Sequence, residues 1–212
     1  MAVVAFSYFL PEVAMEVMGA PNPVITHALR SAAIEFCRRS MAWVAELDAF
    51  QTEADVNAYD LALPAETELV MPKRVFVSGV EIFPMDTGLD TDISTTVAEL
   101  GSATTTHYAV NGDNQLVLVP APAAADLDVV AHVAVCPTRD GDSMDAVLAS
   151  IYYEQIASGA IARLAAQEDK PWHSQTKADR RAARFEAGIL SAMNRMAKGR
   201  TTKSSYIRPV KL

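Results

Sequence analysis

Apolar residues recur at every third or fourth position in two parts of the chain, which is the spacing of helices with one buried face. The first part covers residues 22–47, with a stripe formed by Ile25, Leu29, Ala32, Ala33, Phe36, Trp43 and Leu47. Asn22 is a good N-cap, and Pro23 fits the first helical position because the N–H that it lacks would stay unpaired there. The pattern predicts one long helix near the N-terminus, preceded by a shorter helix that ends at Gly19.

Two further helices are predicted toward the C-terminus. Asp142 and Asp145 resemble a capping box before an apolar stripe that continues to Leu164. The last helix opens at Ser174 or Thr176. Its apolar side carries Phe185, Ile189, Met193 and Met196, and Gly199 follows as a stop signal. We expect Phe36, Trp43, Phe185 and Ile189 to belong to the helical core.

Between these helical parts the apolar residues alternate with polar ones, as in half-buried strands. Ser78-Gly79 and the sequence NGDN at 111–114 are turn signals between such runs, so each predicts a hairpin. Residues 127–137 alternate through Val129, Ala131 and Val133 and predict a further strand. Residues 55–138 are therefore expected to form five or six strands.

Together these patterns predict an α+β fold. We expect a helical bundle, made of the long N-terminal helix and two C-terminal helices, with a β-rich module inserted between them. The predicted domains are the bundle at 1–54 and 139–199, the module at 55–138, and an extended basic C-terminal arm at 200–212.

Charge divides the chain into an acidic body and a basic end. The net charge is -8, yet residues 194–212 contain six Lys or Arg residues and no acid. The remaining residues carry 12 basic and 26 acidic side chains, a net charge of -14. This body should repel nucleic acid phosphates, because DNA binding relies on cations that displace condensed counterions. An acidic surface would instead suit a channel through which DNA slides without sticking.

Composition and the N-terminus add two expectations about the cellular setting. Cys37 and Cys136 lie far apart in apolar surroundings, so we expect reduced core cysteines rather than a disulfide. The apolar N-terminus has no basic flank and meets Pro11 and Glu12 early, which argues against a signal peptide or membrane span. We expect a soluble protein that is made in the cytoplasm.

Residues for catalysis are scarce in this sequence. His27, His107, His132 and His173 have no metal or triad spacing, and the nucleotide-binding glycine motifs are missing. Two acidic clusters could suggest a calcium site: Asp86, Asp90 and Asp92, and Asp140, Asp142 and Asp145. Neither has the ligand alternation of a calcium loop, so we interpret them as a solvated loop and a helix start. We predict no catalytic residue, no metal and no cofactor.

The basic C-terminal end has three interpretations. It could be a frayed terminus, or it could dock on the acidic body of its own chain. It could also be an arm that binds another protein, because it combines cations with apolar anchors and with Pro209, which favours extension.

Several short stretches, in this order, resemble the head-to-tail adaptor (connector) proteins of tailed bacteriophages, the group that includes the tail tubular protein A type. The stretches are ALRSAAIEFCRRSMAW at 28–43, YDLALP at 59–64, YYEQIASGAIARL at 152–164, KPW at 170–172, RFEAGI at 184–189, and the closing KGR and RP. The long loop at 86–107 matches nothing in that group.

The resemblance implies a structural virion protein at the head-tail junction and not an enzyme. Members form rings, commonly of twelve copies, with the portal protein above, a tail or nozzle protein below, and DNA passing through the channel. The C-terminal arm reaches the portal, so the expected portal-binding residues are Lys198, Arg200, Lys203, Tyr206, Ile207, Arg208, Val210 and Lys211. The alternatives are a tail-side nozzle or tail-completion protein, a small metal-dependent hydrolase that uses the Asp clusters, and a DNA-binding packaging factor.

Overall fold

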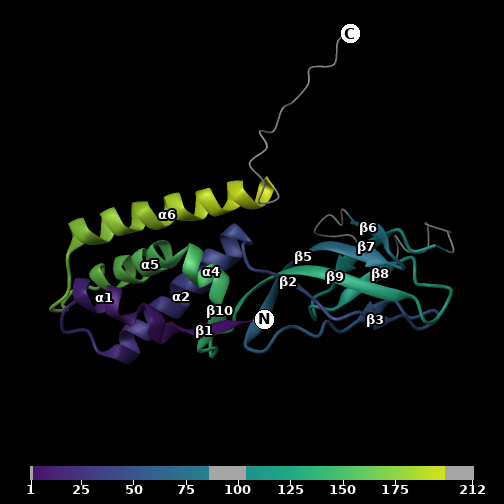
Figure 1. The fold of residues 1–212 in the computed structure, drawn as a ribbon, viewed down its shortest axis with the longest axis horizontal. Coiled ribbons are helices and arrows are strands. Elements are labelled where there is room, and N and C mark those ends of the chain that lie inside the picture. Colours follow the sequence, from purple (N-terminus) through teal and green to yellow (C-terminus); the bar gives the residue numbers. More distant parts are fainter. Residues whose placement is uncertain (1, 86–103, 199–212) are drawn as a thin grey trace, which may run out of the picture. The chain divides into compact units, whose positions relative to one another are not determined.

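The computed structural model describes residues 2–85 and 104–198 (Figure 1). The chain divides into two compact units. The first unit comprises the residues up to Trp43 together with those from Cys136 onward, and the second is Val44–Val135. The described residues form five α-helices, one 3-10 helix and ten strands.

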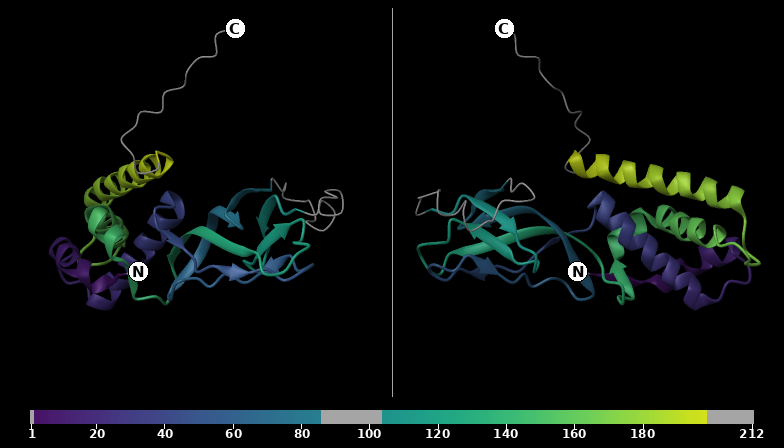
Figure 2. Two further views of the ribbon diagram at one scale, coloured as in Figure 1. Left: turned by 45° about the vertical axis from the view of Figure 1, so that its right-hand side comes forward. Right: turned by 180° about the vertical axis from the view of Figure 1, so that it is seen from behind.

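The first unit is mainly helical. Its helices are η1 (Phe6–Phe9), α1 (Leu10–Glu16), α2 (Asn22–Ser40), α4 (Ala146–Ile151), α5 (Tyr153–Ala165) and α6 (Gln175–Ala197). Helix α5 packs against both α2 and α6, and the two views of Figure 2 show α6 running alongside it. Leu29, Phe36, Ile161, Phe185 and Ile189 are buried in this unit, which confirms the predicted core positions of Phe36, Phe185 and Ile189.

Helix α2 is shorter than the sequence pattern predicts. Pro21 is its N-cap, not Asn22, and it ends at Ser40 because Met41 adopts a left-handed conformation with φ of 52°. Trp43, Ala45 and Leu47 are all buried. Their alternation is the period of a strand. Trp43 and Leu47 flank strand β2 (Val44–Glu46), so the end of the predicted stripe lies in extended chain and not in the helix. Trp43 is a core residue, as predicted, but lies outside the helix.

A small sheet lies within the mainly helical unit. Strand β1 (Val3–Ala5) pairs antiparallel with β10 (Ser143–Asp145), with Val3 opposite Asp145. Helix α4 starts directly after β10, and the Asp145 carboxylate accepts a hydrogen bond of 2.7 Å from the Leu148 N–H. Asp145 is thus the N-cap of α4, whereas Asp142 forms an ion pair with Arg30.

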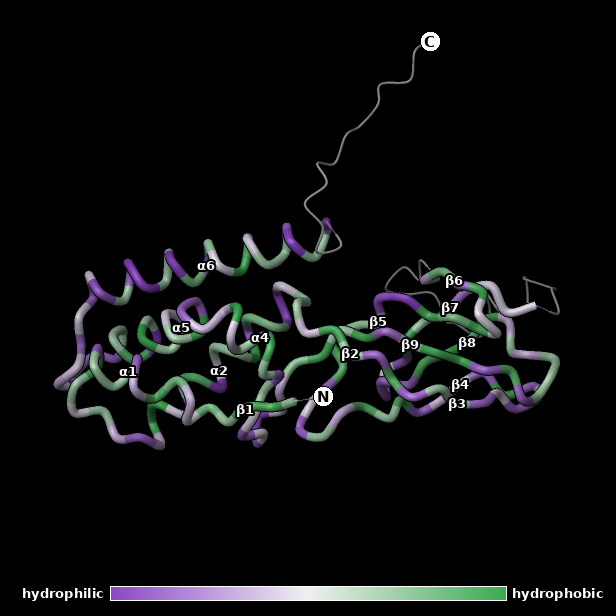
Figure 3. Tube along the Cα trace, in the orientation of Figure 1, coloured by the Kyte–Doolittle hydropathy of each residue, from purple (hydrophilic) through white to green (hydrophobic). Residues whose placement is uncertain are grey.

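The second unit is built on one large, curled β-sheet that forms a half-barrel. Its strands are β2 (Val44–Glu46), β3 (Phe50–Gln51), β4 (Ala58–Tyr59), β5 (Thr67–Val77), β6 (Val80–Pro84), β7 (His107–Val110), β8 (Leu116–Val119) and β9 (Asp128–Pro137). The order is β2-β9-β5-β6-β7-β8-β4, and β3 also pairs with β9. The pair β6 and β7 is parallel. Strands β8 and β9 are largely hydrophobic (Figure 3).

Both predicted hairpins are confirmed. Ser78 and Gly79 have positive φ angles of 49° and 78° and connect β5 to β6. The second turn connects β7 to β8, and the Asn111 side chain accepts hydrogen bonds from the N–H groups of Asp113 and Gln115. The predicted strand at 127–137 is β9.

The predicted fold class is wrong in its architecture. The chain is α+β, but it is not a helical bundle with an inserted β-rich module: a large curled sheet accompanies five helices, and the mainly helical unit contains the β1–β10 sheet. Three-residue strands carry too little periodicity to be recognised, so 1–54 and 139–199 read as helix. The predicted domain bounds stay a prediction, since compactness does not show which segments fold independently.

The two cysteines are buried free thiols, as predicted. Cys37 lies in α2 and Cys136 in β9. Burial raises the pKa of the Cys37 thiol far above its usual range, and the nearby Cys136 raises it further. Cys37 therefore stays protonated and is a poor nucleophile.

Gly159 allows α5 and α6 to approach closely. A Cβ at this position would lie 2.7 Å from ring atoms of Phe185 and 3.1 Å from the Ala32 side chain. We expect Gly159→Ala to lower the free energy of unfolding by about 1–3 kcal/mol, because the ring cannot retreat from a packed core. Urea denaturation followed by circular dichroism measures this. Gly112→Ala is the control, since a Cβ there meets nothing within 4 Å; equal losses in both variants would contradict the close-packing explanation.

Candidate partner-binding surface

Of the predicted portal-binding residues, the structure describes only Lys198. Lys198 is the C-cap residue of α6, and its N–H donates to the Asn194 carbonyl. The other predicted contact residues lie outside the described residues: Arg200, Lys203, Tyr206, Ile207, Arg208, Val210 and Lys211. Portal binding by these residues therefore stays a prediction. The structure describes α6, the helix that precedes the arm in sequence.

Helix α6 is fastened to its neighbours by packing and by ion pairs. Its apolar side inserts Phe185 and Ile189 into the core. The Arg39 guanidinium of α2 donates to the Glu186 carboxylate of α6 at 2.6 and 2.5 Å, and to Glu35 at 2.9 Å. These hydrogen bonds raise the pKa of Arg39 above its usual range and lower the pKa of Glu186. The arm thus continues from a firmly anchored helix.

The outer face of α2 forms a groove of about 370 Å³. We call it the arginine groove, and its charged or titratable lining residues are His27, Arg30, Glu35, Arg38, Arg39 and Arg139. All but Arg139 come from α2, and Arg139 comes from the loop between β9 and β10. The lining thus includes four guanidinium groups and one carboxylate, and the carboxylates of Asp142 and Glu186 also pair with Arg30 and Arg39.

Some of these arginines are held by contacts within the unit. One Arg30 nitrogen donates to the Arg139 carbonyl at 2.9 Å, and another pairs with Asp142 at 2.5 Å. Glu35 accepts from both Arg39 and Arg163. The buried Arg30 Nε has no hydrogen-bond partner among the described residues. These contacts pre-position the guanidinium groups of Arg30 and Arg39.

The groove is suited to binding an anion. The Arg139 side chain is exposed, and neither it nor His27 has a hydrogen-bond or ion-pair partner within residues 2–85 and 104–198. Guanidinium groups bind carboxylates and phosphates through paired N–H donors, more specifically than ammonium groups do. Such a set of guanidinium groups favours ligands that carry negative charge.

The acidity of the chain is concentrated in one unit. Val44–Val135 carries 15 acidic and two basic side chains, a net charge of -13. The other unit carries 11 acidic and 16 basic side chains, a net charge of +5. Without residues 194–212, which contribute six basic side chains, the first unit has 10 basic and 11 acidic side chains and is close to neutral, so the acidity of the body lies mainly in the second unit.

The residues considered for catalysis or metal binding do not converge in the described part of the chain. No group of three or more His, Cys, Asp or Glu residues is placed there to hold a metal ion. Asp142 and Asp145 have structural partners, Arg30 and the N-terminus of α4. The cluster Asp86, Asp90 and Asp92 lies outside the described residues. None of the described helices has both the length and the apolar character needed to cross a membrane.

Sequence reasoning missed the arginine groove. Arg30, Arg38 and Arg39 were visible on the polar side of the first long helix, and that clustering was the available signal. Arg139 follows about a hundred residues later, so only the fold brings it beside Arg30.

A comparison with protein families matches most of the chain. The family model described as SU10 adaptor protein matches residues 9–211. No curated protein matches the chain in sequence.

Proposed function

The chain belongs to the SU10 adaptor protein family, and from this premise we propose that it joins the portal to the tail of a bacteriophage particle. The family confirms the predicted resemblance to phage head-to-tail adaptors. In this proposal the protein is a structural virion component without catalytic activity. Copies of it form a ring around the channel through which DNA passes, with the portal on one side and a tail protein on the other.

We propose further that the basic C-terminal arm is the portal-docking element. The observation that carries this is the charge of residues 194–212, six basic side chains and no acid, in a segment that begins in the last turn of α6, a helix anchored through Phe185 and Glu186. The arm at 200–212 combines four basic side chains with the apolar residues Tyr206, Ile207, Val210 and Leu212. On a partner, the apolar residues would contribute contact area while the cations select an acidic surface.

The test compares the full chain with a version that ends at Lys198. Each is mixed with the purified portal protein, and the mass of the complex is measured by light scattering. We expect a complex of about twelve copies on the portal ring for the full chain, in line with closed symmetric assemblies, and none for the truncated chain. Circular dichroism checks that the truncated chain keeps its fold.

Full-length variants test whether the loss of binding comes from the side chains of the arm and not from the shorter chain. Replacing Tyr206 and Ile207 by serine keeps the charge of the arm and should weaken binding, whereas Thr201→Ala should leave it unchanged. If the truncated chain binds the portal as well as the full chain does, the arm is not the docking element. If neither binds the portal but both bind a tail protein, the tail-side interpretation replaces the adaptor proposal.

A further inference from the structure

Helix α1 is apolar on both of its sides. Val13 and Val17 are buried within the first unit. On the opposite side Met15 is 68% exposed and Met18 is 78% exposed, and Tyr8, in η1 just before the helix, is 51% exposed. A helix at the surface of a protein normally presents polar residues to water. These three exposed side chains form an apolar surface that we call the α1 ridge, and exposed apolar surface of this kind marks a contact with another protein.

The α1 ridge also carries a carboxylate that lacks a cation. Glu12 follows Tyr8 by four residues, which places the two on the same side of the chain. No cation pairs with Glu12 within residues 2–85 and 104–198, whereas the nearby Glu16 pairs with Arg181 of α6. The Tyr8 and Tyr153 rings meet edge to face with centroids 5.2 Å apart; burial raises the pKa of Tyr153, and Glu12 raises it further. A partner that covers the ridge would therefore bury an unpaired charge unless it supplies a cation.

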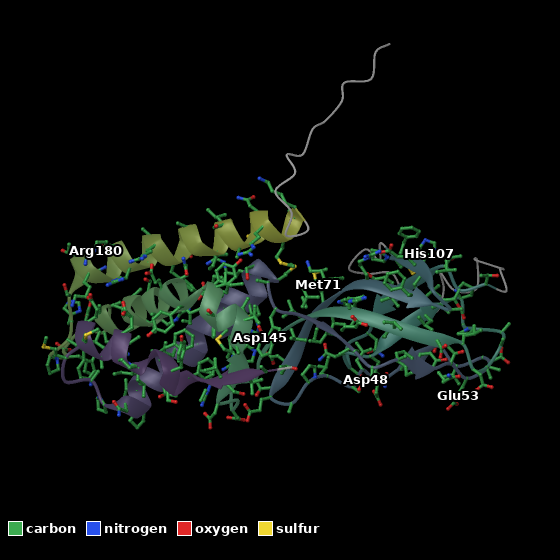
Figure 4. The ribbon with its side chains drawn as sticks, viewed as in Figure 1. Asp48, Glu53, Met71, His107, Asp145 and Arg180 are labelled. Atoms are coloured by element: carbon green, nitrogen blue, oxygen red, sulfur yellow. The ribbon has the colours of Figure 1, made fainter. Side chains whose placement is uncertain are left out.

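The outward side of α6 combines a cation with small and apolar side chains. Arg180, Ala183, Ala187 and Leu190 follow one another at three- and four-residue intervals and are all exposed; we call them the α6 outer face. Arg180, which Figure 4 labels near the N-terminal end of the helix, has no hydrogen bond or ion pair to any residue that the structure describes. The alanines leave shallow space between the larger side chains, into which the side chains of a second helix can pack.

We propose that the α1 ridge of one copy packs against the α6 outer face of a second copy. This rests on the proposed function, since it requires several copies in one assembly, and it names the two surfaces that meet. The methionines of the ridge lie over the alanines of α6, because methionine is long and adapts its shape to the space available. The Arg180 guanidinium donates to the Glu12 carboxylate, which satisfies both charges. Both helices then bury apolar surface that a single copy exposes to water.

Charge favours the α6 outer face over other surfaces of a second copy. Helix α4 also exposes large apolar side chains, Val147 and Ile151, but it contains no cation and follows Asp145. The second unit has a net charge of -13 and would repel Glu12. Of these three surfaces, the α6 outer face offers both apolar side chains and an unpaired cation.

The contact joins unlike surfaces on different sides of the first unit. Helix α5 packs against both α1 and α6, and it lies between them in the views of Figure 2. Each copy therefore keeps one free ridge and one free α6 outer face after the first contact forms. Head-to-tail contacts of this kind produce a closed ring when the rotation between copies returns to the start, and an open filament otherwise.

Disulfide trapping between two variants, each with one added cysteine, tests the contact. Met15→Cys places a thiol on the ridge and Ala187→Cys places one on α6, while the native Cys37 and Cys136 are buried and should not react. The two full-length variants are mixed under mild oxidation, with and without the purified portal protein, and the products are separated on a non-reducing gel. We expect a linked dimer that contains both variants, several-fold more abundant than the dimers that either variant forms alone.

The control pair replaces Ala187→Cys by Ala182→Cys. Ala182 is exposed but lies about 140° around the helix from Ala187, at about 100° per residue, so its linked product should be several-fold less abundant. Glu12→Lys, added to the Met15→Cys variant, should lower the yield several-fold because two cations then meet. Arg180→Glu, added to the Ala187→Cys variant, should restore the yield, which a merely structural effect of either change would not do. Circular dichroism checks that every variant keeps its fold.

Equal yields from the two cysteine pairs, or no linked dimer with or without the portal protein, would overturn the proposal. It would also fail if Met15→Cys linked mainly to itself, because the ridge would then contact a second ridge. Protection of the Met15→Cys thiol from a thiol reagent by the portal protein, without any linked dimer, would assign the ridge to the portal instead.

Portal binding separates this contact from the proposed function. If portal complexes form without the linked dimer, the adaptor function stands and the named contact fails. If the linked dimer forms and the protein does not bind the portal, the contact stands and portal docking fails.

Discussion

Phe185→Ala is expected to lower the free energy of unfolding by about 3–5 kcal/mol, as other large aromatic truncations in cores do. The ring is 4% exposed and has Phe36 as a neighbour, with ring centroids 6.2 Å apart. The Arg163 guanidinium lies over the same ring, 5.4 Å from its centroid. Removing the ring therefore leaves a cavity where α2, α5 and α6 meet and deprives Arg163 of its cation–π contact. Urea denaturation of the full chain measures the change.

Leu190→Ala is the matched control for this prediction. Leu190 lies on the same helix and is 57% exposed, so its truncation should change stability by less than about 0.5 kcal/mol. The double variant Gly159→Ala with Phe185→Ala adds a second check, because the ring that would clash with the new methyl group is gone. Its loss should be smaller than the sum of the two single losses. Additive losses would show that the two residues do not share the packing described above.

The second large effect concerns Glu16, whose carboxylate connects α1 to α6. It accepts from the Arg181 guanidinium at 2.8 Å and lies 3.5 Å from the Lys177 ammonium. Burial alone would raise the pKa of Glu16, but the hydrogen bond and charge of Arg181, with those of Lys177, outweigh burial and lower it below its ordinary value of 4.5. Since the folded state favours the ionised form, Glu16 contributes stability above about pH 4.5 and loses it as the pH falls through the lowered pKa.

Two variants measure this contribution. Glu16→Gln should be less stable than the unaltered protein at pH 7, and the difference should shrink toward pH 3. Arg181→Met should lose about 1.5–3 kcal/mol at pH 7, the range for hydrogen bonds to charged groups. The buried Arg181 Nε lacks a hydrogen-bond partner among the described residues, which removes part of the penalty of deleting this side chain. Denaturation curves from pH 3 to pH 7 provide the comparison.

Glu168→Gln is the control for the pH experiment, because Glu168 is exposed in the loop after α5. Its stability curve should follow that of the unaltered protein across the whole range. A difference between Glu16→Gln and the unaltered protein that is independent of pH would contradict the electrostatic explanation and indicate lost packing instead.

The sequence predicted elements correctly where a short motif favours one backbone conformation, as in the two hairpin turns. Ser78-Gly79 and the turn after Asn111 require positive φ or a side-chain acceptor, and both hairpins are present. The apolar stripe predicted for α6 was right for Phe185 and Ile189, which are buried, and wrong for Met193, which is 44% exposed. Asn22 and Asp142 were misassigned, since a capping residue is chosen by its neighbours in space as well as by sequence.

Prediction failed where the signal depended on distant residues. Trp43 and Leu47 fit a helix and a strand equally well, and only the pairing of β2 with β9 decides between them. The strands β1 and β10 are three residues each, and they pair only because the chain returns to β1 after the 137 residues that separate Ala5 from Ser143. The arginine groove likewise depends on the fold, which brings Arg139 beside Arg30 of α2. The positive charge of the arm could be read from the sequence, but the residues that the arm contacts could not.

The pairing of β1 with β10 also bears on the order in which the protein can fold during synthesis. The second unit is one continuous stretch, whereas the first unit needs both Trp43 and the residues from Cys136 onward. At about 5–20 residues per second, roughly 5 to 20 s pass between the two halves of the first unit. Until then the apolar side of α2 has neither α5 nor α6 to cover it. A chaperone that binds nascent chains would therefore find an apolar site on α2, near the N-terminus, until the C-terminal helices are synthesised.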